Sequence, residues 1–182
     1  MLGILLIGFV ILVAIFFFLT YNSLITQRAR INNAWSQIDV QLKRRYDLVP
    51  NLVQTVKGYA KHEKSLFKDI TKARAATGRA KSIGQKAKAD NMLSETLKSI
   101  LAVAENYPKL RANENFMMLQ EELAGIESKI AYARQFYNDS VLAFNTAIQT
   151  VPTNIVAGMF SFTRRDYFKA QGEERKNVKV KF

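Results

Sequence analysis

The first apolar positions of the chain form one unbroken run. Residues 2–19 read LGILLIGFVILVAIFFFL and carry no charged and no strongly polar side chain. Extended to Tyr21, the run reaches the roughly 20 residues with which a helix crosses a bilayer. A cleavable signal peptide has a basic start, a shorter apolar run and a small-x-small cleavage site, and this run shows none of them. The pattern therefore predicts an uncleaved transmembrane anchor over residues 1–21, with Tyr21 at the interface.

Beyond the anchor, apolar residues recur at the spacing of a helix. From Ile31 they step by four and three residues, in a heptad seam that a single charge, Arg45, interrupts. Because nothing separates the anchor from this seam, we expect one long helix that ends near Lys61. Pro50 lies inside it and removes the backbone hydrogen bond to Tyr46, which predicts a kink or a local break.

Three further helices follow in the pattern. They are expected at about Glu63–Arg79, at about Lys88–Asn106, and from a cap at Asn113 to just before Pro152. A turn rich in glycine and polar residues, 77–85, separates the first two. Two long seams and two shorter helices that together match one seam predict an all-α fold, in which the transmembrane helix continues into an elongated antiparallel four-helix bundle over residues 22–151.

The last segment, residues 152–182, has a different composition. It is apolar and aromatic at first, then basic, which predicts a short helix near Asn154–Phe160 and a mobile tail over 175–182. Its rings and cations either contact the membrane surface or fold back over the end of the bundle or onto a neighbouring subunit. The residues concerned are Phe160, Phe162, Arg164, Arg165, Tyr167 and Phe168.

Charge adds a candidate partner to this picture. The 27 Lys and Arg residues exceed the 15 Asp and Glu residues by 12, which suggests a polyanionic neighbour. One segment concentrates this charge without an intervening acid, and it is either a solvated loop or a contact for anionic lipid headgroups or another acidic surface. Nucleic acid is not expected, because the interleaved aromatic residues of single-strand binders are missing. The basic residues are Lys72, Arg74, Arg79, Lys81, Lys86 and Lys88.

The distribution of charge around the anchor predicts an orientation. No Lys or Arg precedes the apolar run, whereas Arg28, Arg30 and the cluster 43–45 follow it. The positive-inside rule then places the N-terminus outside and the bundle in the cytoplasm, as expected for a single-pass protein.

The sequence offers little for catalysis. The absence of Cys excludes disulfides, Cys-ligated zinc and thiol chemistry, and a single His excludes a multi-His metal site. His62 stands next to Glu63, but adjacent helix positions face different ways and do not form an acid–base dyad. With no Gly-rich phosphate loop either, we expect a non-enzymatic protein without a cofactor.

Arg45 raises a structural question. Its stem can lie along the core while the guanidinium reaches solvent. Alternatively it pairs across the bundle with an acid near the start of the last long helix, Glu121, Glu122 or Glu127, and Glu122 is the partner we select.

Three blocks of the chain resemble the LemA family of bacterial membrane proteins. They are AWSQIDVQLKRRYDLVPNLVQTVKGYAKHE (34–63), LRANENFMMLQEELAGIESKIAYARQFYND (110–139) and YNSLITQRARINNAWS (21–36), and the anchor position and PTNIVAGMFSFTRRDYF (152–168) agree. The resemblance implies an N-terminal anchor and a cytoplasmic antiparallel bundle, and it supplies no catalytic residues. Relatives in magnetosome membranes suggest a part in membrane shaping.

Two functional hypotheses remain open at this point. In the first, the protein is homo-oligomeric and acts as a scaffold or in membrane remodelling, with the lipid bilayer as its partner. In the second, it is an adaptor that presents partners to a membrane protease or signalling protein.

Overall fold

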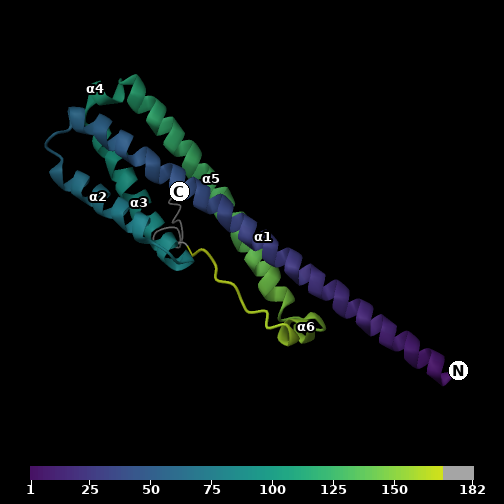
Figure 1. Ribbon diagram of the computed structural model, residues 1–182. Coiled ribbons are helices and arrows are strands. Elements are labelled where there is room, and N and C mark those ends of the chain that lie inside the picture. The colour runs from purple at the N-terminus through teal and green to yellow at the C-terminus, as the bar shows by residue number, and fades with distance from the viewer. Residues whose placement is uncertain (170–182) are drawn as a thin grey trace, which may run out of the picture. The chain divides into compact units, whose positions relative to one another are not determined.

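A computed structural model describes residues 1–169 of the chain, and all the regular structure in that range is helical (Figure 1). This confirms the predicted all-α fold with a long N-terminal helix. The helices are α1 (Leu2–Tyr59), α2 (Lys64–Arg79), α3 (Ile83–Ala104), α4 (Pro108–Arg111), α5 (Glu114–Ala147) and α6 (Thr153–Met159).

The connection between α2 and α3 is shorter than the sequence suggested. The turn was expected over 77–85, yet α3 already begins at Ile83. A capping box explains the early start: Ser82 Oγ accepts from the Gln85 backbone N–H at 3.2 Å, and Gln85 Oε1 accepts from the Ser82 N–H at 3.3 Å. This box satisfies two backbone donors that would otherwise be unpaired at the start of the helix.

The other helix ends lie close to their predicted positions. Asn113 caps α5, because its Oδ1 accepts from the Phe116 backbone N–H at 3.0 Å. Helix α6 occupies the place of the expected short helix, whereas the one-turn helix α4 was not expected. The basic tail, 175–182, lies outside the described residues.

The chain folds as two compact units. Unit 1 comprises Met1–Gln37 and Arg134–Tyr167, and unit 2 comprises Ile38–Ala133 together with the described residues Phe168 and Lys169. This grouping follows packing, whereas the predicted boundaries at residues 21 and 151 follow composition. Both α1 and α5 contribute residues to each unit.

Unit 1 has a core drawn from three helices. The half-buried indole of Trp35 on α1 packs against the buried ring of Tyr137 on α5, with centroids 5.7 Å apart. The fully buried aliphatic and aromatic residues of this unit are Leu24, Ile31 and Ala34 of α1, Tyr137, Val141 and Phe144 of α5, and Val156 and Ala157 of α6.

Unit 2 holds four long helical segments and the one-turn helix α4 around one core, and α2 and α3 form its antiparallel hairpin (Figure 1). The segments are the part of α1 from Ile38, α2, α3 and the part of α5 up to Ala133. Each contributes a buried stripe at helical spacing, as expected for bundle packing. The innermost residues include Leu52, Ile70, Leu93, Ile100 and Phe116.

Candidate membrane-contact and interaction sites

The N-terminal part of α1 presents its apolar side chains outward. Helix α1 is long and apolar enough to cross a membrane, and none of its most hydrophobic 18-residue window is buried against the rest of the chain. The exposed residues run from Leu2 to Leu19 and include Phe9, Leu12 and Phe18. A continuous apolar surface of this length is stable only in lipid or against another apolar surface.

Aromatic side chains gather where this apolar stretch ends. The ring of Tyr21 lies 4.6 Å from that of Phe160 and 6.0 Å from that of Phe162, measured between centroids. Phe162 also contacts Phe144 of α5 at 6.2 Å, and the Arg28 guanidinium lies over the Phe162 ring at 5.5 Å. The segment after α6 is therefore folded back onto α1 and α5 within unit 1.

Backbone hydrogen bonds hold this segment in place. The Asn145 side chain is buried and clamps Arg165 at two points, accepting from its N–H at 2.8 Å and donating to its carbonyl at 2.9 Å. Tyr137 Oη donates to the carbonyl of Asp166 at 2.8 Å. Burial, and secondarily the charge of Asp166, raise the pKa of Tyr137, while Arg165 acts in the opposite direction.

The structure thus separates the residues predicted for lipid or partner contact. Phe160, Arg164, Arg165 and Tyr167 are exposed, while Phe162 is half-buried in the aromatic group. Phe168 is buried and belongs to unit 2.

The basic segment 72–88 is likewise divided. Lys72, Arg79, Lys81 and Lys88 are exposed. Lys86 forms an ion pair with Asp39 of α1. The exposed cations near the end of α2 and the start of α3 form a basic corner of unit 2, which consists of Arg79, Lys81 and Lys88.

Arg74 has a separate task that follows from Pro50. Helix α1 continues through Pro50, which has no N–H to offer the carbonyl of Tyr46. Arg74 Nε donates to this carbonyl at 3.4 Å, and its guanidinium lies 4.1 Å from the centroid of the Tyr46 ring. A cation from α2 therefore replaces part of the helical bond that the proline removes.

Arg45 lies in the core of unit 2, and its guanidinium does not reach solvent. Its guanidinium forms ion pairs with Asp90 of α3 and with Glu127 of α5, the latter at 2.5 Å, and it donates to Ser94 Oγ at 2.7 Å. The side chains of Arg45 and Asp90 are both 0% exposed, whereas Glu127 is 39% exposed. The selected partner Glu122 is wrong, because its side chain is exposed on another part of α5.

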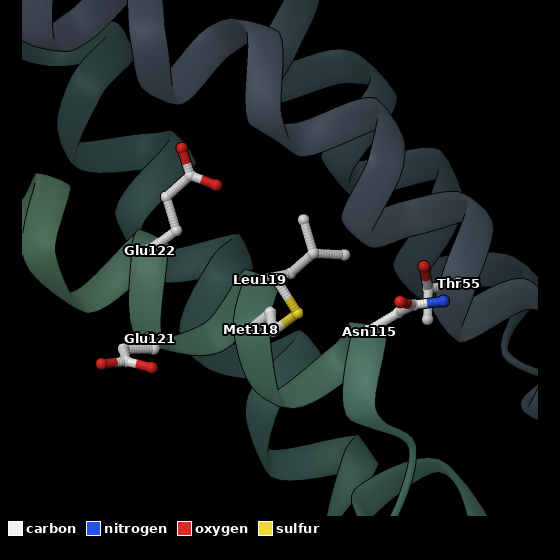
Figure 2. A pocket seen from close by; sticks show the side chains of 6 residues that line it. All are labelled: Thr55, Asn115, Met118, Leu119, Glu121 and Glu122. Carbon is white, nitrogen blue, oxygen red and sulfur yellow. The ribbon is translucent and has the colours of Figure 1, made fainter.

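Unit 2 also has a pocket of about 540 Å³ between α1 and α5. Figure 2 shows Thr55 of α1 and Asn115 of α5 at one end and two glutamates of α5 at the other. The lining residues are Thr55, Asn115, Met118, Leu119, Glu121 and Glu122. An apolar floor with an acidic rim is suited to a segment that is both apolar and basic.

No constellation for metal chemistry occurs within residues 1–169, since no three His, Cys, Asp or Glu side chains lie together there. Of the residues that sequence reasoning missed, Asp90 and Asn145 matter most. Asp90 had a detectable signal, because it precedes Leu93 and Leu97 at seam spacing.

Sequence comparison relates this chain to known proteins. The chain is 25% identical over 174 residues to the Magnetosome protein MamQ of Magnetospirillum gryphiswaldense. The aligned region covers 81% of this chain and 64% of MamQ, so the chain spans less than two thirds of that relative. It is 27% identical over 177 residues to Protein LemA of Metamycoplasma hominis, which covers 93% of this chain and 80% of that protein. The model of the LemA family matches residues 34–182. With its exposed apolar N-terminal helix and a family match over most of its length, this chain is a membrane protein that belongs to the LemA family.

Proposed function

We propose that this protein is a non-enzymatic scaffold, anchored in the bacterial inner membrane, that self-assembles and takes part in membrane shaping. The observation that carries the proposal is a pair of large exposed side chains on α5 in unit 2. Met118 and Tyr132 are exposed there, and Met118 also lines the acidic pocket. Large exposed apolar side chains beside a pocket are typical of a protein contact surface.

Charge complementarity supplies the geometry of assembly. The rim of the pocket carries Glu121 and Glu122, and the basic corner of unit 2 presents Arg79 and Lys81. These are different surfaces of one unit, so a contact between the pocket of one copy and the corner of the next is heterologous. Such contacts repeat from copy to copy and form rings or filaments, which is the arrangement a scaffold requires.

The relatives support a membrane role. MamQ is named as a magnetosome protein, and the similarity with this chain covers 64% of the length of MamQ. The excess of cations after the anchor supports a single-pass topology with the N-terminus outside and the bundle in the cytoplasm.

An adaptor function is the second candidate, and a groove favours it. A cavity of about 430 Å³ lies between α1 and α2 and is lined in part by Val49, Pro50, Val53 and Ile70. The rest of its lining includes Gln54, Lys57, Thr71 and Arg74. A groove of this mixed character between two helices accepts a helical or extended segment of a partner, such as a membrane protease or a signalling protein.

The test is electron microscopy and mass measurement of the full-length protein in mild detergent. Self-assembly predicts ordered high-mass particles, and the double variant Met118→Asp/Tyr132→Asp is expected to reduce them to small species. Val40→Asp is the matched control, since Val40 is an exposed apolar residue of α1 in the same unit. A monodisperse monomer for the unmodified chain contradicts the scaffold, and a stoichiometric second protein in cross-linked membranes then supports the adaptor.

A further inference from the structure

Helix α6 and its flanks carry an apolar face that no other part of unit 1 covers. Ile155 and Met159 are 55% and 65% exposed and stand four residues apart on α6, while Val151 before the helix and Phe160 after it are 79% and 51% exposed. Residues four apart lie on the same side of a helix. The opposite side of α6 holds the buried Val156 and Ala157, so the exposed face is not part of the core.

The position of this face relative to the anchor is fixed by a ring contact. Phe160, at the end of α6, lies 4.6 Å from Tyr21 between ring centroids. Tyr21 follows directly on the apolar stretch, and a helix from Leu2 to Tyr21 is about 30 Å long, the thickness of the hydrocarbon core. Tyrosines at such ends lie at the level of the lipid headgroups. The exposed face of α6 is therefore at the same level.

Cations accompany the apolar face. Arg28 is exposed two turns beyond Tyr21 on α1, and its guanidinium lies over Phe162 at 5.5 Å. Arg164 is exposed and donates to Gln149 Oε1 at 2.5 Å, which keeps it beside the end of α5. Both cations belong to unit 1, and an apolar surface bordered by Arg is typical of segments that lie in a membrane interface.

The clamp on the following segment makes this arrangement a built one. Asn145 holds both backbone groups of Arg165, and Tyr137 holds the carbonyl of Asp166. These bonds join the chain after α6 to α5, so α6 is held from both of its ends and does not depend on lipid for its position.

We propose that α6 is a second membrane contact, lying in the interface beside the anchor with Val151, Ile155, Met159 and Phe160 among the lipid chains and Arg28 and Arg164 at the phosphates. The proposal rests on the membrane anchoring of the chain and is independent of self-assembly. A second copy of the chain is the other possible cover of this face, and the experiment separates the two.

The experiment uses full-length protein in phosphatidylcholine vesicles that contain phosphatidylglycerol. The chain has no Cys, so Met159→Cys gives a single site for an environment-sensitive fluorophore. The matched control is Val40→Cys, another exposed apolar side chain, on α1 in unit 2 and outside the surface proposed for self-assembly. We expect the probe at position 159 to emit at shorter wavelength, to lose several times more intensity to brominated lipid than the control probe, and to resist quenching by aqueous iodide.

Two results overturn the proposal. Equal quenching by iodide at both positions places α6 in water. A shorter emission wavelength that disappears when the vesicles are diluted to one protein each, without quenching by brominated lipid, assigns the face to a second copy. We further expect brominated lipid to quench the probe at position 159 in Ile155→Ala but not in Ile155→Asp, because only the second change places a charge on the apolar face.

Discussion

Replacement of Arg45 by Met tests whether the buried ion pairs of unit 2 stabilise the bundle. Arg45 and Asp90 are both 0% exposed, so Arg45→Met leaves the Asp90 carboxylate in the core without its cation. Removing one partner of a buried pair typically costs about 3–5 kcal/mol. Glu127 loses the same cation but is 39% exposed and regains water, so it adds little to the loss.

The measurement is urea unfolding of the full-length protein in mild detergent, followed by circular dichroism. We expect Arg45→Met to lower the free energy of unfolding by about 3–5 kcal/mol. The double variant Arg45→Met/Asp90→Leu is expected to recover most of this loss, since apolar replacement of a whole buried pair is often neutral or stabilising. Lys43→Met is the control, because Lys43 pairs with Asp47 on the exposed surface of the same helix and its loss is expected to cost less than about 1 kcal/mol.

The reasoning is refuted if Arg45→Met is as stable as Lys43→Met. It also fails if the double variant loses the sum of the two single losses, since contacting partners must show a coupling energy. Either result means that the two charges do not stabilise each other in the folded chain.

Three further predictions concern other polar contacts. Arg74→Met is expected to lower the free energy of unfolding by about 1–2 kcal/mol, because the carbonyl of Tyr46 loses its donor. In a chain that also carries Pro50→Ala, Arg74→Met is expected to have little effect, because the alanine restores the backbone N–H for that carbonyl. Urea unfolding of the two single variants and the double variant measures this coupling. Asn145→Leu is expected to speed amide hydrogen exchange in the segment after α6, read by mass spectrometry, whereas unchanged protection there contradicts the clamp. The pKa of Tyr137 in the folded chain is raised above 10.0, so the unfolded chain loses this proton first and the stability of the fold falls as the pH rises past that value. The melting temperature of Tyr137→Phe is therefore expected to fall less steeply with pH in this alkaline range.

The elements of this fold could be predicted from the spacing of apolar residues, and one charged exception pointed to the core pair. Arg45 was detectable because it stands between Leu42 and Val49 in the seam. Asp90 stands in an equivalent place before Leu93 but was overlooked, because α3 was expected to begin only at about Lys88. In the first turn of a helix an acid is ordinary, whereas in a helix that begins at Ile83 the same acid is interior.

The choice between acids on α5 could not be made from the sequence. Glu122 and Glu127 both border the buried stripe that contains Leu123 and Ile126. Five positions turn a helix by about 140° beyond a full turn, so the two acids lie on opposite flanks of the stripe. Which flank faces α1 depends on how the helices pack, and periodicity alone does not contain that information.

The C-terminal segment shows the same limit at longer range. Its composition indicated a surface role for its rings and cations, and Phe160 and Arg164 are indeed exposed. The hydrogen bonds that position this segment come from Asn145 and Tyr137 of α5. No sequence pattern around these two residues indicates that they bind the backbone of a later segment. A single polar residue beside an apolar seam is as often solvated as it is engaged.

A second membrane contact would explain how one anchor can serve an assembly. A single transmembrane helix is free to rotate about its axis and to tilt, because its lipid-facing side chains are all apolar. Contact by α6, which lies to the side of α1 within unit 1, opposes that rotation. Copies held in this way share one orientation of unit 1 relative to the bilayer. Heterologous contacts between copies require such a shared orientation. Loss of the α6 contact in Ile155→Asp should therefore reduce the order of assemblies on membranes, while particles formed in detergent, where no bilayer sets the orientation, stay unchanged.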